Sequence, residues 1–218
     1  MSIFSTIIVL FVLLFAITVH EAAHGWAAFK MGDPTAYHLG RVTLNPIAHI
    51  DPIGTILVPL MLAIMGFPFF GWAKPVPVNP LNLRNPRRDN LLISAAGPIS
   101  NLTVAFIGFF GIIILKTLTS GFQEGSSQSF VNLASGIFFI LYYTIVINVI
   151  LATFNLIPVP PLDGSGVLLG LISNEAAQKY EQIRPYGFII IILMWITGIL
   201  RAIFGFILGI VDLFIRLV

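Results

Sequence analysis

Long uncharged runs dominate the pattern of hydrophobic and polar positions along this chain. A membrane-spanning helix needs about 20 predominantly apolar residues. Four stretches meet that length at least loosely and a fifth is borderline: Ile3–Phe29, Leu91–Leu118, Phe130–Phe154, Tyr186–Val218 and, as the borderline case, Ile53–Phe70. Arg201 interrupts the last long stretch, which could form one tilted span or a hairpin of two short helices. The pattern predicts an all-α polytopic bundle with about four to six membrane segments.

Composition places the chain among integral membrane proteins. Of its 218 residues, 57% are hydrophobic and 9% are charged, with a mean hydropathy of +0.99, whereas roughly a quarter of the residues in soluble domains are charged. The formal net charge of +2 is too small to indicate nucleic acid, so the expected partners are the lipid bilayer and other membrane proteins. No Lys or Arg precedes the first apolar run, which we expect to be a retained span. We expect one membrane domain over residues 1–218, with a core at 1–165 and C-terminal membrane segments at 186–218.

The distribution of positive charge predicts the orientation. Segments 30–52, 71–90 and 159–185 carry eight Lys and Arg residues and segment 119–129 carries none. Because cytoplasmic loops are enriched in these residues, we place the first three segments in the cytoplasm of a multi-pass plasma-membrane protein. A crossing by 53–70 would reverse this rule. We therefore predict a small re-entrant or extended, β-like element between the first two core spans, buried in protein or lining a wet cavity.

Two histidines and a glutamate stand inside the first apolar run, in TVHEAAHGW. On a helix His20 and His24 share a face one turn apart, while Glu21 points aside. This is the HExxH arrangement of two zinc ligands and a general base. The alternative is a histidine pair that packs between helices, with Glu21 as its ion partner. Because ionisable groups inside a membrane are costly and usually functional, the metal site is favoured.

The position of the motif predicts its depth. His20 lies ten residues before Lys30, which is about 15 Å along a helix at 1.5 Å per residue. That is roughly half of a hydrocarbon layer about 30 Å thick. We therefore expect the site within the bilayer, open toward the cytoplasmic side.

Two histidines leave a catalytic zinc site one protein ligand short. Such sites use three protein ligands and a water, and a chain without cysteine must supply nitrogen or oxygen. The remaining acidic residues are Asp33, Asp51, Asp89, Glu124, Asp163, Glu175, Glu181 and Asp212. Asp163 is favoured because it follows an apolar run within the break PVPPLDGSG, which can aim a short side chain into the interior. Its alternative role is to cap the next helix.

Other polar residues give weaker signals. His49 and Asp51 form a rival metal pair, but a spacing of two residues in a loop favours a structural role, with gating or substrate contact as the functional alternative. His38 is expected to be a solvated loop residue.

The order of these motifs resembles the site-2 protease family of intramembrane zinc metalloproteases. The family pairs HExxH on one span with an Asn, a Pro and an Asp-Gly on a later one. The corresponding residues are His20 to His24, then Asn155, Pro158, Asp163 and Gly164, with Ala96, Gly97, Pro98 and Asn101 resembling the family's Ala-Gly-Pro-x-x-Asn. Segment 41–80 resembles compact prokaryotic members. No PDZ-like or CBS-like stretch is found.

The resemblance implies a zinc-dependent endopeptidase that hydrolyses peptide bonds within or near the transmembrane segments of membrane proteins, in regulated intramembrane proteolysis. One Zn²⁺ would be held by His20, His24 and Asp163. Glu21 would act as the general base, and Asn155 would bind the substrate backbone or the developing oxyanion. Asn101 is expected to support helix packing rather than chemistry.

A substrate with a single transmembrane helix must extend locally before attack, because helical hydrogen bonds hide its peptide bonds. Segment 71–80, GWAKPVPVNP, is rich in proline and should be extended. We hypothesise that Lys74, Pro75 and Val76, or the 41–52 loop, pair with the substrate as an added strand.

Two other functions stay open at this point. One is a non-proteolytic zinc-binding scaffold or transporter. The other is a different membrane zinc protease whose third ligand is Glu124, Glu175 or Glu181.

Overall fold

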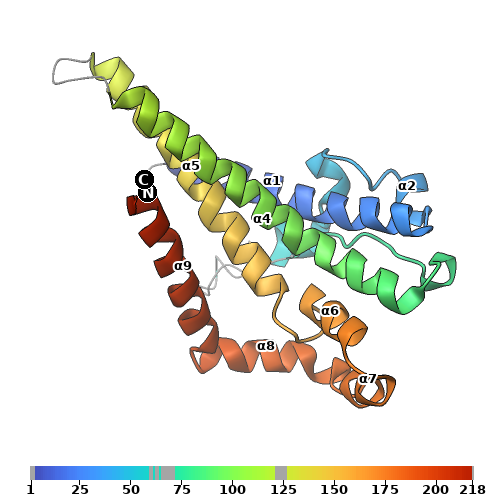
Figure 1. The fold of residues 1–218 in the computed structure, drawn as a ribbon. Coiled ribbons are helices and arrows are strands. Elements are labelled where there is room, and N and C mark those ends of the chain that lie inside the picture. Colours follow the sequence, from blue (N-terminus) through green and yellow to red (C-terminus); the bar gives the residue numbers. More distant parts are fainter. Residues whose placement is uncertain (1–2, 59–60, 62–63, 65–71, 121–126, 218) are drawn as a thin grey trace.

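The computed structural model describes residues 3–58, 61, 64, 72–120 and 127–217. Three long helices form its centre: α1 (Ile3–Met31), α4 (Pro86–Thr119) and α5 (Gln128–Asn155). All three are long and apolar enough to cross a membrane. Helix α4 packs against both α5 and α1 (Figure 1). The predicted all-α membrane architecture is confirmed.

The C-terminal region forms a bent pair of helices. Helix α8 (Gly187–Ile196) and helix α9 (Ile199–Leu217) meet at an angle of 68°, and together they would make a fourth span. The break lies at Gly198, whose φ of +82° belongs to the left-handed region that glycine tolerates best. Arg201, which the sequence suggested as the interruption, lies inside α9. Helix α9 folds back and contacts α5.

Short elements connect the long helices. After α1 come α2 (Thr35–His38), the 3₁₀ turn η1 (Pro46–His49), the π-helical turn η2 (Pro52–Leu57) and the 3₁₀ turn η3 (Pro80–Asn82). After α5 come α6 (Asp163–Leu171), α7 (Asn174–Glu181) and the 3₁₀ turn η4 (Arg184–Tyr186). Helix α6 packs against α4, and this contact brings the second half of the chain back to the first.

The predicted re-entrant or extended, β-like element forms no β-strand in the part of it that the structure describes. The described residues contain no β-strand, and residues 72–79 run without regular secondary structure between η2 and η3. Prolines at 75 and 77 explain this, because a residue without an N–H cannot donate to a strand ladder. The predicted re-entrant stretch Ile53–Phe70 begins as η2, and the rest of it falls almost entirely outside the described residues.

Apolar packing holds the bundle together around a polar centre. One buried cluster joins Val12 and Ala16 of α1 to Ile147 of α5, and another joins Ile112 of α4 to Ile145 of α5. The same helices also bury several polar side chains: His20, His24, Asn101 and Asn148. Buried polar groups in such surroundings need partners, and those partners define the candidate site.

Candidate active site

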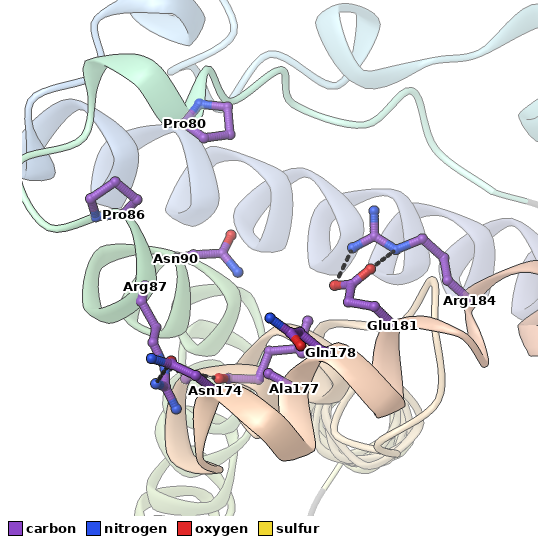
Figure 2. Close-up of a pocket in the computed structure, with 11 residues that line it drawn as sticks. Pro80, Pro86, Arg87, Asn90, Asn174, Ala177, Gln178, Glu181 and Arg184 are labelled. Atoms are coloured by element: carbon purple, nitrogen blue, oxygen red, sulfur yellow. Dashed lines mark hydrogen bonds and ion pairs between the residues drawn. The ribbon is translucent and has the colours of Figure 1, made fainter.

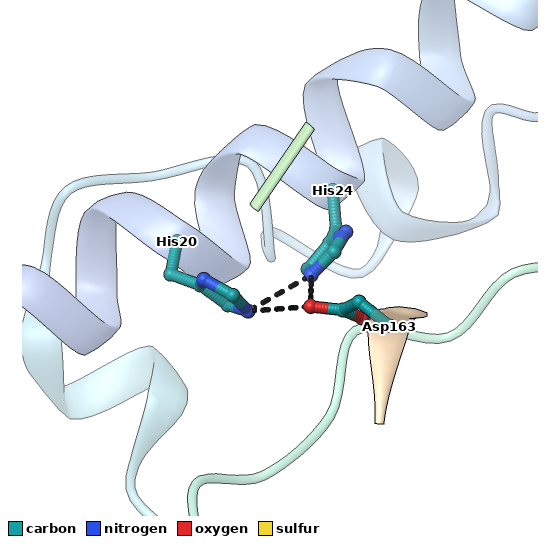
Figure 3. A group of neighbouring side chains, drawn as sticks. All are labelled: His20, His24 and Asp163. Atoms are coloured by element: carbon teal, nitrogen blue, oxygen red, sulfur yellow. Dashed lines mark hydrogen bonds and ion pairs between the residues drawn. The ribbon is translucent and has the colours of Figure 1, made fainter. Parts of the chain in front are cut away.

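Helix α1 delivers the first two candidate ligands to its face against α4. His20 and His24 are 7% and 8% exposed, and one helical turn brings their Nε2 atoms to 3.1 Å (Figure 3). No charged residue lies between Ile3 and Val19, so this part of α1 is held by apolar packing. The local sequence therefore places two imidazoles where water has little access.

Asp163, more than a hundred residues later in the chain, brings a carboxylate to the two histidines. The chain leaves α5 at Asn155, passes through the proline-rich break and begins α6 at Asp163. Its Oδ2 lies 3.1 Å from Nε2 of His20 and 3.3 Å from Nε2 of His24. Figure 3 shows the three side chains meeting at their tips. Within the described ranges, this is the one group of three His, Asp or Glu residues whose ligand atoms all lie within 4.8 Å of one another.

The other ring nitrogens are already engaged. Nδ1 of His20 lies 2.6 Å from Oδ1 of Asn101, and Nδ1 of His24 lies 2.7 Å from the carbonyl oxygen of Ile93. Because both oxygens accept, Nδ1 is the donor in each ring, and Nε2 is the nitrogen that faces Asp163 and can offer its lone pair to a metal. Oδ2 of Asp163 is buried and has no hydrogen-bond donor. Three electron-rich atoms therefore converge on one point, which calls for a positive charge there.

Zinc fits this donor set. Zn–N and Zn–O bonds of about 2.0–2.2 Å in a tetrahedral site set the donor atoms about 3.3 Å apart. The three observed separations are 3.1, 3.1 and 3.3 Å. Three protein ligands are also the number typical of catalytic zinc, which keeps its fourth position for water or substrate. The residues present can hold a catalytic zinc ion.

Helix α4 comes so close to the ligands that only glycine fits at the contact. A Cβ on Gly97 would collide with Nε2 of His24 and with the ring of His20. One turn later lies Asn101, which is fully buried and whose amide group donates to the carbonyl of Ala16 at 3.1 Å and to Oδ1 of Asn148 at 2.8 Å. The Ala-Gly-Pro-x-x-Asn motif thus makes room for both rings and orients one of them.

Glu21 lies beside the ligands, on another face of α1. Its Oε2 accepts the backbone N–H of Val76 at 3.0 Å. No other hydrogen bond to this carboxylate occurs among the described residues, so Oε1 keeps its capacity to accept a proton. The residues 72–79, hereafter the 72–79 segment, therefore run directly past the candidate general base.

A buried arginine fixes the 72–79 segment from one side. Arg41 is 6% exposed, and its Nη2 donates to the carbonyl oxygens of Lys74 at 2.5 Å and Pro75 at 3.4 Å. The N–H of Lys74 donates to the carbonyl of His49 at 3.0 Å. These bonds hold the backbone immediately before Val76, which sets where the Val76 N–H points.

A buried aspartate fixes the other end. Asp33 is 0% exposed and accepts the N–H of Asn79 at 2.7 Å, the side-chain amide of Asn82 at 2.8 Å and the hydroxyl of Thr35 at 2.5 Å. Burial raises the pKa of this carboxyl, but the hydrogen bonds from Asn82, Thr35 and Asn79 outweigh that effect and lower the pKa below its usual value. Asp33 is therefore ionised at neutral pH and joins the end of α1 to the start of η3.

Comparison with known proteins agrees with this geometry. The model of peptidase family M50 matches residues 8–196, a range that contains both candidate ligand regions. This chain belongs to peptidase family M50. The M50 chain is 40% identical over 189 residues to YwhC of Bacillus subtilis, which is named as a zinc metalloprotease, and the match covers 85% of this chain and 78% of that protein. No solved structure matches it significantly.

Two mycobacterial relatives of the M50 chain are also named as zinc metalloproteases. Rip2 of Mycolicibacterium smegmatis is 29% identical, with 86% of this chain and 66% of that protein covered. Rip2 of Mycobacterium tuberculosis strain H37Rv is 24% identical, with 92% and 71% covered. Because these matches cover most of the chain, the similarity extends well beyond the HExxH motif.

The remaining predicted site residues of the M50 chain come from the end of α5 and from the 72–79 segment. Asn155 ends α5, and its side-chain amide donates to the carbonyl of Leu151 at 3.0 Å. Its assignment as a catalytic residue stays a prediction. Lys74, Pro75 and Val76 belong to the 72–79 segment and are bound by Arg41, His49 and Glu21 as described above. Their contact with substrate also stays a prediction.

Sequence reasoning missed three residues that organise the M50 site. Asn101 was expected to serve packing, yet it contacts a candidate ligand directly. Asn148 was not singled out, although a fully buried amide in the middle of an apolar span is a signal that could have found it. Arg41 was counted only as a loop charge. Its burial depends on the fold, and nothing in its sequence neighbourhood indicates it.

The rival ligands are occupied elsewhere. Asp51 accepts the N–H groups of Ile53 and Gly54 and caps η2. Asp89 accepts the N–H of Asn85, Glu181 pairs with Arg184, and Asp212 lies 3.4 Å from the hydroxyl of Tyr142. His49 is 2% exposed and bonds Thr43, which agrees with a structural role, and His38 is exposed at the end of α2. Glu175 lies exposed in the first turn of α7, and Glu124 lies outside the described residues.

Proposed function

We propose that this peptidase is zinc-dependent and hydrolyses peptide bonds within or near the transmembrane segments of membrane proteins. The observation that carries the proposal is the convergence of three lone-pair donors, on His20, His24 and Asp163, beside the carboxylate of Glu21 and inside a bundle of apolar helices. Named zinc metalloproteases among its relatives support the metal. Regulated intramembrane proteolysis in the plasma membrane is the process that we infer.

The expected chemistry divides between the metal and the protein. Bound zinc lowers the pKa of a water toward about 7 and polarises the scissile carbonyl. Glu21 accepts the proton of the attacking water and returns it to the leaving amine. The Val76 N–H, which holds Oε2 of Glu21, orients this carboxylate. Asn155 is the candidate donor to the substrate backbone or to the developing negative charge on the carbonyl oxygen.

The site accepts a substrate only in extended form, because a helix hides its peptide bonds. The 72–79 segment is the best-placed template for such a chain, since it passes Glu21 directly. Most N–H groups of this segment already donate hydrogen bonds, and its prolines have no N–H. Within the described part of the chain, the N–H of Val78 and the carbonyl of Val76 have no hydrogen-bond partner. We infer that a substrate pairs with these two groups, with its scissile bond beside Glu21.

The position of the site favours approach from the cytoplasmic side. His20 lies ten residues before Lys30, about 15 Å along α1 and therefore near the bilayer centre. Residues between α5 and α8, which include Asp163, carry Lys179 and Arg184, as expected for a cytoplasmic segment. A membrane protein with a single transmembrane helix is the substrate class we infer.

The test compares wild-type protein with Glu21→Gln in reconstituted membranes that contain a panel of tagged single-span proteins. Zinc content is measured on both samples. Glu21→Gln keeps all three ligands, so we expect about one zinc per chain in both proteins and loss of cleavage in the variant. Glu175→Gln, an exposed change on α7, is the matched control and should cleave normally.

Two results would contradict the proposal. Equal cleavage by wild type and Glu21→Gln would show that Glu21 does not act as the general base. Zinc-loaded wild type that cleaves no member of a broad panel would favour a non-proteolytic zinc-binding scaffold or transporter.

A further inference from the structure

A cavity with several polar side chains in its wall lies at the far end of α6 from the candidate zinc ligands. Its volume is about 530 Å³, and its walls come from η3, the start of α4, the end of α6, α7 and η4 (Figure 2). The walls include Pro80, Arg87, Asn90, Leu169, Gln178 and Arg184. No step of the proposed hydrolysis uses this space.

The two elements that border the catalytic centre both lead to the cavity. On one side, α6 begins with the candidate ligand Asp163 and reaches the cavity at Leu169, about 9 Å away at 1.5 Å per residue. On the other side, the 72–79 segment contacts Glu21 at Val76 and reaches the cavity at Pro80, at most about 13 Å away at 3.3 Å per residue. An extended substrate that lies between these elements would enter the cavity three or four residues from its scissile bond.

Among the residues that the structure describes, no acidic group pairs with Arg87, whose positive charge lines the cavity. Arg87 donates through Nε to the carbonyl of Leu169 at 3.2 Å and through Nη1 to the side-chain oxygen of Asn174, and both acceptors are neutral. The other arginine of the wall, Arg184, is paired with Glu181 at 3.0 Å. The local balance is therefore positive.

Two amide side chains add to the hydrogen-bonding capacity of this space. Figure 2 shows Asn90 of α4 and Gln178 of α7 extending into it from opposite walls. Neither side chain has a hydrogen-bond partner within the part of the chain that the structure describes. Each can donate through its NH₂ group, and Arg87 retains unused N–H groups as well. This combination suits a carboxylate.

We propose that this cavity is a specificity subsite for an acidic substrate side chain, three or four residues from the scissile bond on the side that leads out through the cavity. The inference rests on the proposed function, because it names the substrate feature that the same site selects. A preference for an acidic residue would be selective, because cytoplasmic flanks of membrane spans are usually rich in Lys and Arg. An acidic residue at this distance would distinguish a substrate from most other single-span proteins.

The experiment uses a single-span substrate that wild type cleaves in the panel above, with its scissile bond mapped by mass spectrometry. Residues three and four positions away, on each side in turn, are changed to Asp, Asn or Lys. Because Arg87 is solvent-exposed, we expect a modest effect. Wild type should prefer Asp over Asn by about three- to fivefold in kcat/KM, on one side only, and disfavour Lys.

Enzyme variants then assign the preference to the cavity. Arg87→Gln should remove the difference between Asp and Asn substrates, and Arg87→Glu should reverse the order so that Lys is preferred. Arg201→Gln, an exposed arginine on α9 outside the cavity, is the matched control and should keep the wild-type preference. Zinc content of each variant shows that the metal site is intact.

Three outcomes would overturn the inference. Cleavage of all substrates at equal rates rejects the subsite and leaves the protease function standing. Absence of cleavage by zinc-loaded wild type rejects the function and the subsite together. An Arg87→Gln effect that is equal for all substrates, and that appears only in vesicles with phosphatidylglycerol rather than phosphatidylcholine alone, assigns the cavity to an anionic lipid headgroup.

Discussion

The orientation of His20 depends on a chain of buried amides. Asn148 donates to the carbonyl of Thr144 at 2.8 Å and accepts from Asn101 at 2.8 Å, and Asn101 accepts from Nδ1 of His20 at 2.6 Å. Both asparagines are 0% exposed. In an apolar bundle such a chain is tolerated only when its members are paired. The same pairing keeps the proton on Nδ1 and leaves Nε2 available to a metal.

Asn101→Ala should weaken zinc binding. Without the Asn101 side chain, the His20 ring loses the hydrogen bond that holds it in one orientation and keeps its proton on Nδ1. Loss of a residue that hydrogen-bonds a metal ligand typically lowers metal affinity 10- to 100-fold, and we expect about 30-fold here. Zinc affinity is measured by competition with a chelator in detergent. Asn132→Ala is the control, because Asn132 is exposed on α5 and bonds Gln128. Unchanged affinity in Asn101→Ala would show that helix packing alone orients the ring.

Gly97→Ala should remove zinc through steric conflict. The new methyl group would occupy space now held by the rings of His20 and His24, so α4 must move away or the rings must turn. We expect zinc content to fall well below one per chain. Gly136→Ala provides the contrast, because a Cβ there meets nothing within 4 Å, and removing a helical glycine should be neutral or stabilise by about 0.5–1 kcal/mol. A zinc-loaded Gly97→Ala protein would contradict the close approach.

At the scale of elements, the sequence predicted the long helices more reliably than the short ones. The three long helices were visible because each has more than twenty nearly uninterrupted apolar residues, a signal that neighbouring elements do not alter. Helix α6 has nine residues, too few for a periodic pattern to identify it. Its functional residue, Asp163, was found instead from the proline break and the family motif. The path of the 72–79 segment was not predictable, because contacts with Arg41, His49 and Asp33 from distant positions determine it.

Val76→Pro tests what the 72–79 segment does for Glu21. Proline removes the one N–H that this segment donates to the carboxylate, and flanking prolines at 75 and 77 make the new residue compatible with its neighbours. A hydrogen bond to a charged group contributes about 1.5–3 kcal/mol, so we expect kcat to fall by about tenfold or more with zinc content unchanged. Val76→Ala keeps the N–H and should retain most activity. Equal kcat in both variants would show that Glu21 needs no such partner.

At the scale of the whole molecule, the candidate zinc site joins the first long helix to α6. His20 and His24 come from α1 and Asp163 from α6, and α6 in turn packs closely on α4, where a Cβ at Gly170 would collide with Leu91. A bound ion would therefore connect elements that lie far apart in the sequence. Without it, three lone-pair donors face one another at 3.1–3.3 Å and favour separation of α6 from α1.

Removal of the metal should therefore lower thermal stability as well as abolish cleavage. A ligand at 1,000 times its Kd stabilises the folded state by about 4 kcal/mol, so dialysis against 1,10-phenanthroline should lower the Tm of the purified protein, and added Zn²⁺ should restore it. Magnesium should not, because it prefers oxygen ligands in octahedral geometry. His20→Ala, which lacks one ligand, should show a low Tm that neither phenanthroline nor Zn²⁺ changes by a comparable amount. If chelation lowered the Tm of wild type and His20→Ala equally, the stabilising ion would be bound elsewhere in the protein, and α1 and α6 would be held together by packing alone.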